Sequence, residues 1–117
     1  MPKINSKPIV CICKPEEMVN INFDLYIDPS HVGCVVSGGD SEIERWTKAN
    51  RIEWICYLPQ WNIYKDNAKL IRDKDMIDFS DVLIIFWNNK NFNTLKVIEY
   101  AQQISCPYIC HFIKDLD

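Results

Sequence analysis

The sequence has few arginines, and it has no apolar run long enough to cross a membrane. Only three arginines occur among its 117 residues, and the formal net charge is -3. A general nucleic-acid binder needs a basic stripe that releases phosphate counterions, which this charge balance does not provide. A transmembrane helix needs roughly 18 consecutive apolar residues, and no run in the chain approaches that length. We therefore expect neither a membrane protein nor a nucleic-acid partner.

A secretory signal is also missing from the pattern. Residues 1–8 are polar and interrupted by proline, without the apolar region that a signal peptide contains. We therefore expect a cytoplasmic protein, in which the six cysteines stay reduced.

The cysteines are interpreted mainly as small buried apolar side chains. Four of them lie in apolar, strand-like runs, where a reduced cysteine packs as a hydrophobe: Cys11, Cys13, Cys34 and Cys56. The alternative is a metal site that joins the first pair to Cys106, Cys110 and His111. Neither spacing is the two-residue knuckle typical of zinc sites, so we expect no metal and no cofactor.

Five short apolar runs rich in β-formers alternate with helical patterns, which predicts an α/β fold. The predicted strands cover residues 9–13, 32–36, 52–58, 82–87 and 108–113. Continuously apolar strands are typical of parallel sheets covered on both faces, and parallel strands need crossover connections. We expect a single domain over residues 1–117, a three-layer Rossmann-like fold with a mainly parallel five-stranded sheet.

The connections between the predicted strands differ in clarity. Ser41 and Glu44 form a capping box that predicts a helix over residues 41–50. Further helices are predicted over residues 66–78 and, from the apolar spacing of Leu95, Ile98, Ala101 and Ile104, over residues 95–104. The exposed side of the helix over 66–78 is predicted to carry Lys69, Arg72, Asp73, Lys74 and Asp75. In the first connection, residues 15–17 favour a helix start and residues 20–23 a break.

The segment after the second predicted strand has the pattern of a phosphate loop. Ligands of open α/β sheets bind outside the carboxyl ends of the strands, next to the topological switch point. Ser37, Gly38, Gly39 and Asp40 follow the second strand, and paired glycines let backbone amides approach an anion at a helix start. A tight strand-to-helix turn is the alternative, and the negative charges of Asp40 and Glu42 count against a tightly held phosphate.

Aromatic residues and one arginine follow the third predicted strand. Trp61 and Tyr64 are placed to stack on a nucleobase, with packing against the sheet edge as the alternative. The planar fork of Arg72 suits a phosphate or a carboxylate, and a solvated pair with Asp73 or Asp75 is the competing interpretation.

Asparagines dominate the loop after the fourth predicted strand. They supply hydrogen-bond donors and acceptors, and they tolerate left-handed backbone, which suits the binding of ribose or phosphate oxygens. The loop contains Trp87, Asn88, Asn89, Asn91, Asn93 and Thr94.

Taken in order, these segments resemble the YspA-like branch of the SLOG superfamily, the Rossmannoid group that includes the Lonely Guy and DprA proteins. The resemblance covers roughly residues 9–113 and rests on residues 35–39, 59–64, 71–76 and 86–94. It implies a nucleotide-derived ligand, such as a nucleoside monophosphate or an ADP-ribose-like molecule. By position, Ser37, Gly38 and Gly39 would hold phosphate, Arg72 would match the arginine of an Arg-Asn motif, and Thr94 would end the second glycine-rich loop.

The chain departs from the family pattern where that pattern carries catalysis. The Lonely Guy enzymes place a glutamate just after the glycine–threonine pair, whereas Thr94 is followed by Leu95 and Glu99 is too far along. Without a matching carboxylate, hydrolysis of an N-glycosidic bond lacks its acid or base. Other departures are Glu42, Asn89 and Asn93 in place of glycines, Asp73 after Arg72, and Ile12, Cys13 and Lys14 in place of Gly-Ser-Arg.

Three functions are therefore weighed. The leading hypothesis is a non-catalytic domain that binds a small nucleotide or nucleotide-derived signal, as a sensor or a sequestering protein. The first alternative is a nucleotide phosphoribohydrolase or glycosidase, whose carboxylate would be Asp40, Asp73 or Glu99. The second alternative is a protein-interaction module that has lost its ligand, with Trp61 or Trp87 at the interface.

A homodimer is also expected, because domains of the resembled family often dimerise. The helix that carries Leu95, Ile98 and Ile104 would share an apolar stripe with a second copy.

Overall fold

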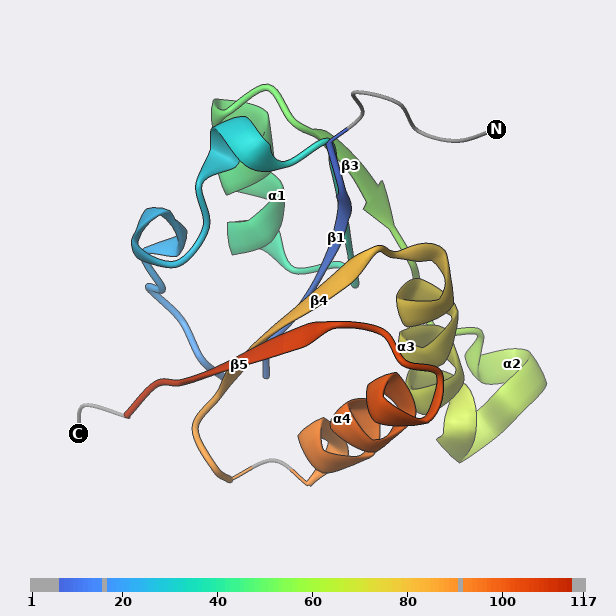
Figure 1. Cartoon of the computed structure of the whole chain (residues 1–117). Helices are drawn as coiled ribbons and strands as arrows, with labels where there is room; N and C mark the ends of the chain where they lie inside the picture. Colours follow the sequence, from blue (N-terminus) through green and yellow to red (C-terminus); the bar gives the residue numbers. More distant parts are fainter. Residues whose placement is uncertain (1–6, 16, 91, 115–117) are drawn as a thin grey trace.

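The computed structural model describes residues 7–15, 17–90 and 92–114 and confirms the predicted α/β class. Its centre is a five-stranded parallel sheet in the order β3-β2-β1-β4-β5 (Figure 1). The strands are β1 (Ile9–Cys13), β2 (Cys34–Ser37), β3 (Glu53–Cys56), β4 (Val82–Trp87) and β5 (Tyr108–Phe112). All five apolar runs therefore form strands, with some ends shifted by one or two residues. Asn91 and residues 1–6, part of the polar segment over residues 1–8, lie outside the described residues.

The order of the strands places a switch point at the middle of the sheet. β1 pairs in parallel with β2 on one side and with β4 on the other. The chain therefore builds outward from β1 through β2 to β3, and then returns to add β4 and β5 on the opposite side. Connections leave β1 and β4 toward opposite faces of the sheet, which opens a crevice at their carboxyl ends.

Helices cover both faces of the sheet, which gives three layers (Figure 1). Helix α1 (Ser41–Ala49) lies on one face, and α3 (Ala68–Phe79) and α4 (Asn93–Gln103) lie on the other. A four-residue helix, α2 (Trp61–Tyr64), and a 3₁₀ turn, η3 (Lys65–Asn67), precede α3. Two further 3₁₀ turns, η1 (Phe23–Leu25) and η2 (Pro29–His31), lie between β1 and β2. No described helix is both long enough and apolar enough to cross a membrane.

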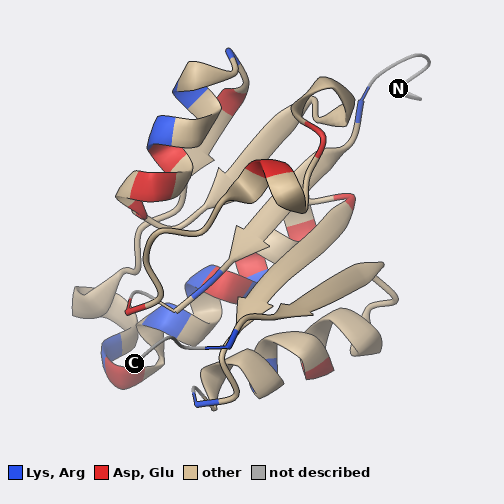
Figure 2. Cartoon of the chain, turned by 90° about the vertical axis from the view of Figure 1, so that its left-hand side faces the viewer, with Lys and Arg blue, Asp and Glu red and all other residues tan. Residues whose placement is uncertain are grey.

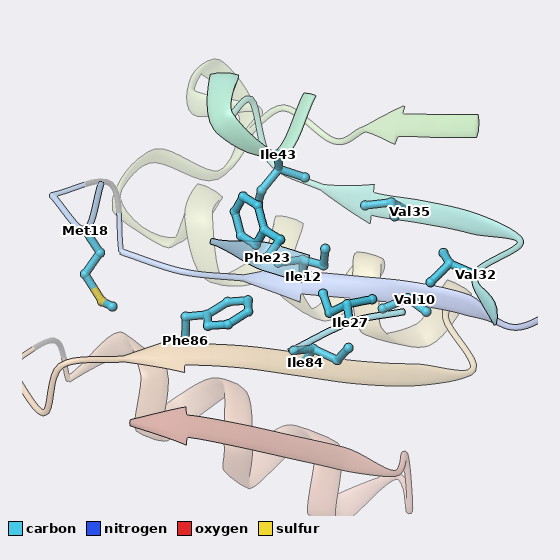
Figure 3. Packing of buried hydrophobic residues seen from close by; sticks show 10 residues of the cluster. All are labelled: Val10, Ile12, Met18, Phe23, Ile27, Val32, Val35, Ile43, Ile84 and Phe86. Atoms are coloured by element: carbon cyan, nitrogen blue, oxygen red, sulfur yellow. The ribbon is translucent and has the colours of Figure 1, made fainter. Parts of the chain in front are cut away.

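On the α1 face, the irregular segment between β1 and β2 packs against the sheet where a crossover helix would normally lie. Among the described residues between β1 and β2 there is no α-helix, but Met18, Phe23 and Ile27 are buried. The Phe23 ring meets the Phe86 ring edge-on with centroids 5.5 Å apart, and Ile43 of α1 joins the same cluster (Figure 3). The break predicted at residues 20–23 is thus present, whereas the helix start at 15–17 includes Glu16, which is not described.

The core on the opposite face fixes the two helices that border the crevice. Met76 and Ile77 of α3 pack with Val97 and Ala101 of α4 against buried residues of β4. The inward side of α4 is therefore formed by Val97 and Ala101, together with the buried Thr94. Leu95 and Ile104, which belong to the apolar spacing that predicted this helix, are exposed by about two-fifths of their surface.

Three predictions about local environment are wrong. Helix α1 is capped by Asp40 rather than Ser41, because the Asp40 carboxylate accepts hydrogen bonds from the N–H groups of Glu42 and Ile43. Arg72 and Asp73 are not on an exposed helix side: their side chains are only 13% and 15% exposed. Cys56 is exposed rather than buried, because β3 is an edge strand.

Candidate functional site

A cavity of about 510 Å³ lies at the carboxyl ends of the strands, at the switch point. Ile12 and Cys13 of β1 and Ile85 of β4 line it from the sheet, while Met76 and Val97 line it from the two helices. Its volume falls within the range of small-molecule sites, and its position is where ligands of open α/β sheets bind. The switch point of the sheet therefore holds a cavity that is large enough for a small-molecule ligand.

Seven of the twelve predicted site residues line this cavity. They are Gly38, Gly39, Asp40, Trp61, Arg72, Asn93 and Thr94. Three connections between strands therefore converge on one space. The other five predicted residues are not part of the lining: Ser37, Tyr64, Trp87, Asn88 and Asn89.

Each of these five residues has a local environment of its own. The Ser37 side chain is fully buried. Its hydroxyl is satisfied there, because it donates to the Gly38 carbonyl and accepts from Trp54 Nε1. Asn88 is buried and accepts a hydrogen bond from the Lys90 N–H, while Asn89 takes a left-handed φ of 67°. Tyr64 ends the exposed helix α2, and Trp87 packs against the core on the α3 and α4 face.

Arg72 crosses from α3 to the glycine loop and packs directly against Gly38. A Cβ atom added at Gly38 would collide with the Arg72 guanidinium, so this glycine is required by close approach. Neither Gly38 nor Gly39 has a positive φ, and a Cβ atom at Gly39 would meet only ordinary contacts. The two glycines of the loop therefore differ in role, and only Gly38 makes room for the arginine.

The guanidinium of Arg72 is held at two of its three nitrogens. Nε donates to Asp73 Oδ1 at 2.8 Å, and Nη1 donates to the Tyr57 carbonyl oxygen at 3.5 Å. Nη2 donates a hydrogen bond to no described residue, and it is not completely buried. Arg72 is therefore a cation held in place within the lining of the cavity.

Asp73 is a largely buried carboxylate in the lining of the cavity. Burial raises the pKa of Asp73 above its ordinary value of 3.8, while the neighbouring Arg72 works in the opposite direction. A carboxyl group in an enclosed site with a raised pKa is the type that can exchange protons during catalysis.

Lys14 neutralises the acidic start of α1. Its side chain is only 2% exposed, and its ammonium group lies 2.5 Å from Asp40 Oδ2 and 2.6 Å from the Met18 carbonyl oxygen. Glu42 Oε1 lies further away, at 3.8 Å. Figure 2 shows acidic residues at the start of α1 and basic residues further along it, as its dipole favours. The amides at this helix start already hold the carboxylate of Asp40.

The thiol of Cys13 lines the cavity but is poorly suited to act as a nucleophile. Its sulfur lies 3.9 Å from the sulfur of Cys11. The hydrogen bond between them, followed by burial, raises the pKa of Cys13 well above its ordinary value of 9.0. The thiol therefore stays protonated near neutral pH. Within the described ranges, no three cysteine, histidine or acidic side chains gather as a metal site would require.

Several lining residues were missed by the sequence interpretation. Lys14 and Met76 contribute to the cavity, and Leu58 joins Trp61 at its rim. Asp73, which the sequence interpretation considered only as an acid for hydrolysis, also lines the cavity. A signal existed for Lys14, which directly follows the first strand, the usual place for a site residue. The charged stretch of α3 gave no such signal, because its mixed charges are equally typical of a solvated face.

The chain was compared with protein-family models, curated proteins and solved structures, and nothing matched. The site is therefore interpreted from its own geometry.

Proposed function

We propose that this protein binds a small nucleotide or nucleotide-derived signal without cleaving it, as a sensor or a sequestering protein. The observation that carries the proposal is Arg72, a cation that packs against Gly38, pairs with Asp73 and lines a cavity of about 510 Å³. An arginine fixed in this way is suited to contact a phosphate oxygen.

The rim of the cavity offers a surface for the apolar part of such a ligand. Trp61 is about half exposed and Leu58 more than half, and both line the cavity beside Pro59. An aromatic ring at the mouth of a polar cavity can stack on a nucleobase. The Thr94 hydroxyl, which no hydrogen bond to a described residue engages, lies on another wall.

The resemblance to the SLOG superfamily supports the same proposal. Of the five residues that would match its motifs, Gly38, Gly39, Arg72 and Thr94 line one cavity, whereas Ser37 is buried outside the lining. Asn89, which stands where the family pattern has a glycine, takes the left-handed backbone that a glycine would favour.

The arrangement of carboxylates favours binding over catalysis. Asp40 caps α1 and pairs with Lys14, and Glu99 does not line the cavity. Asp73 is the remaining candidate among the three acids considered for hydrolysis. Its burial in the cavity is the observation that favours a nucleotide glycosidase as the second candidate function.

Thermal unfolding in the presence of nucleotides tests the proposal. A ligand that binds only the native state raises the melting temperature as its concentration rises above Kd. We expect at least one of the common nucleoside phosphates or ADP-ribose to stabilise the wild-type protein. Arg72→Gln, which removes the charge but retains a donor near Asp73, should weaken that binding at least about tenfold.

Lys74→Gln provides the matched control, because it removes a cation from the same helix at a residue that does not line the cavity. Equal stabilisation of the wild type and Arg72→Gln by every ligand would contradict the proposed site. The absence of any stabilisation would favour the interaction module instead.

A further inference from the structure

The charges that line the cavity are balanced, which limits the kind of anion that it can hold. Among the described residues, the cationic side chains of the lining are Lys14, Lys69 and Arg72, and the carboxylates are Glu17, Asp40 and Asp73. Each buried cation has a carboxylate close by: Lys14 pairs with Asp40, and Arg72 pairs with Asp73. A doubly charged ligand would therefore enter a site without a net positive charge to receive it.

The hydrogen-bonding geometry of Arg72 leads to the same conclusion. A terminal phosphate binds arginine best through two parallel N–H donors of the fork. In this structure Nε donates to Asp73 Oδ1 at 2.8 Å, and Nη1 contacts the Tyr57 carbonyl oxygen at 3.5 Å. The side of the fork that includes Nε is therefore already occupied by a carboxylate and is not free for a terminal phosphate.

At the start of α1, two backbone amides are already engaged by a carboxylate. Asp40 Oδ1 accepts hydrogen bonds from Glu42 N at 2.9 Å and from Ile43 N at 3.1 Å. These are the amides that would otherwise bind an anion at a helix N-terminus. Because Lys14 also neutralises this carboxylate, Asp40 is stabilised in its capping position.

We infer that the ligand presents a singly charged phosphate diester to Arg72, rather than a doubly charged terminal phosphate. The inference rests on the proposed function and specifies its ligand class. A phosphomonoester carries nearly two negative charges above its second pKa of about 6, whereas each diester phosphate carries one. Asp73, which accepts a hydrogen bond from Arg72 Nε, repels the second charge and so sets the preference.

Matched nucleotide pairs test this inference by isothermal titration calorimetry at about pH 8, where the monoester is doubly charged. For each of the four common bases, the 3′,5′-cyclic monophosphate is compared with the 5′-monophosphate on the full chain. We expect the cyclic form of the preferred base to bind about tenfold more tightly than the linear form, as one extra repulsion at short range predicts.

Two variants separate charge from ligand shape. Asp73→Asn removes the repelling charge but keeps an oxygen that can accept from Arg72 Nε, so the cyclic-to-linear affinity ratio should fall severalfold. Asp75→Asn makes the same charge change on an exposed part of α3 that does not line the cavity, so the ratio should stay as in the wild type.

The possible outcomes distinguish this inference from the proposed function. Tighter binding of the linear monophosphate, or a ratio that Asp73→Asn leaves unchanged, overturns the inference while the binding function stands. If none of the eight nucleotides binds, the inference fails, and the proposed function is then decided by thermal unfolding with ADP-ribose and the other nucleoside phosphates.

Discussion

At the scale of single residues, the site depends on how one arginine is held. Gly38 gives the guanidinium of Arg72 its space, and Asp73 and the Tyr57 carbonyl fix its orientation. The sequence interpretation named Gly38 and Arg72 separately, but it could not relate them, because they are brought together only by the packing of α3 against β2. For the same reason it placed Asp73 in solvent.

The two glycines should respond differently to substitution by alanine. Gly38→Ala places a methyl group where the Arg72 guanidinium now lies, so we expect nucleotide affinity to fall about tenfold as the charged contact is displaced. Gly39→Ala should change affinity by less than about twofold, because its Cβ meets Leu58 at an ordinary 3.5 Å. Calorimetric titration of both variants checks this, and equal losses would show that Arg72 is not the anchor. The bulkier, charged Gly39→Glu should abolish binding.

The ionisation of Asp73 should leave a signature in the pH dependence of stability. Because its pKa is raised in the folded state, its stabilising contribution is complete below the ordinary value of 3.8 and is lost as the pH rises through the folded-state pKa. The free energy of unfolding of Asp73→Asn, relative to wild type, should therefore increase between about pH 3 and about pH 7. Urea unfolding over this range measures the difference, and a relative decrease would contradict the assignment.

At the scale of elements, the sequence pattern predicted the regular segments better than their ends. Apolar runs identified all five strands, most clearly the inner strands β1, β2 and β4, because a parallel strand covered on both faces is mostly apolar. The helix over residues 41–50 was placed correctly, but its cap was not. Asp40 and Ser41 are both good capping residues, and the choice between them depends on Lys14, which is distant in the sequence.

Substitutions at the start of α1 should separate these two residues. Asp40→Ala removes the cap and should lower the free energy of unfolding by about 1 kcal/mol or more, since it also leaves Lys14 without its nearest partner. Asp40→Asn keeps a capping oxygen and should lower it less. Ser41→Ala, whose side chain caps nothing in this structure, should cost less than about 0.5 kcal/mol in urea unfolding. A larger loss for Ser41→Ala than for Asp40→Ala would restore the capping box.

At the scale of the whole molecule, the cavity and the exposed apolar surface of α4 are separate features. The cavity lies at the carboxyl ends of β1 and β4, whereas Leu95 and Ile104 of α4 are exposed away from its lining. The sequence could predict that ligand loops meet at one edge of the sheet. It could not predict the strand order, which depends on how distant segments pair.

We still predict a homodimer, and the exposed apolar residues of α4 indicate which surface it would use. If Leu95 and Ile104 pack against a second copy, sedimentation at micromolar concentration should show a dimer that Leu95→Lys converts to monomer. Leu25→Lys, at a more exposed residue between β1 and β2, should leave the dimer intact. A wild-type protein that sediments only as a monomer would exclude the dimer.

The central claim is that a nucleotide-derived molecule binds at Arg72 and is released unchanged. Native mass spectrometry of the protein mixed with nucleotides and ADP-ribose derivatives, followed by chemical analysis of the released molecules, tests both halves of this claim together. The predicted result is a one-to-one complex, lost in Arg72→Gln and retained in Lys74→Gln, from which the intact ligand is recovered. Free base and ribose phosphate that disappear in Asp73→Asn would contradict it and establish a hydrolase.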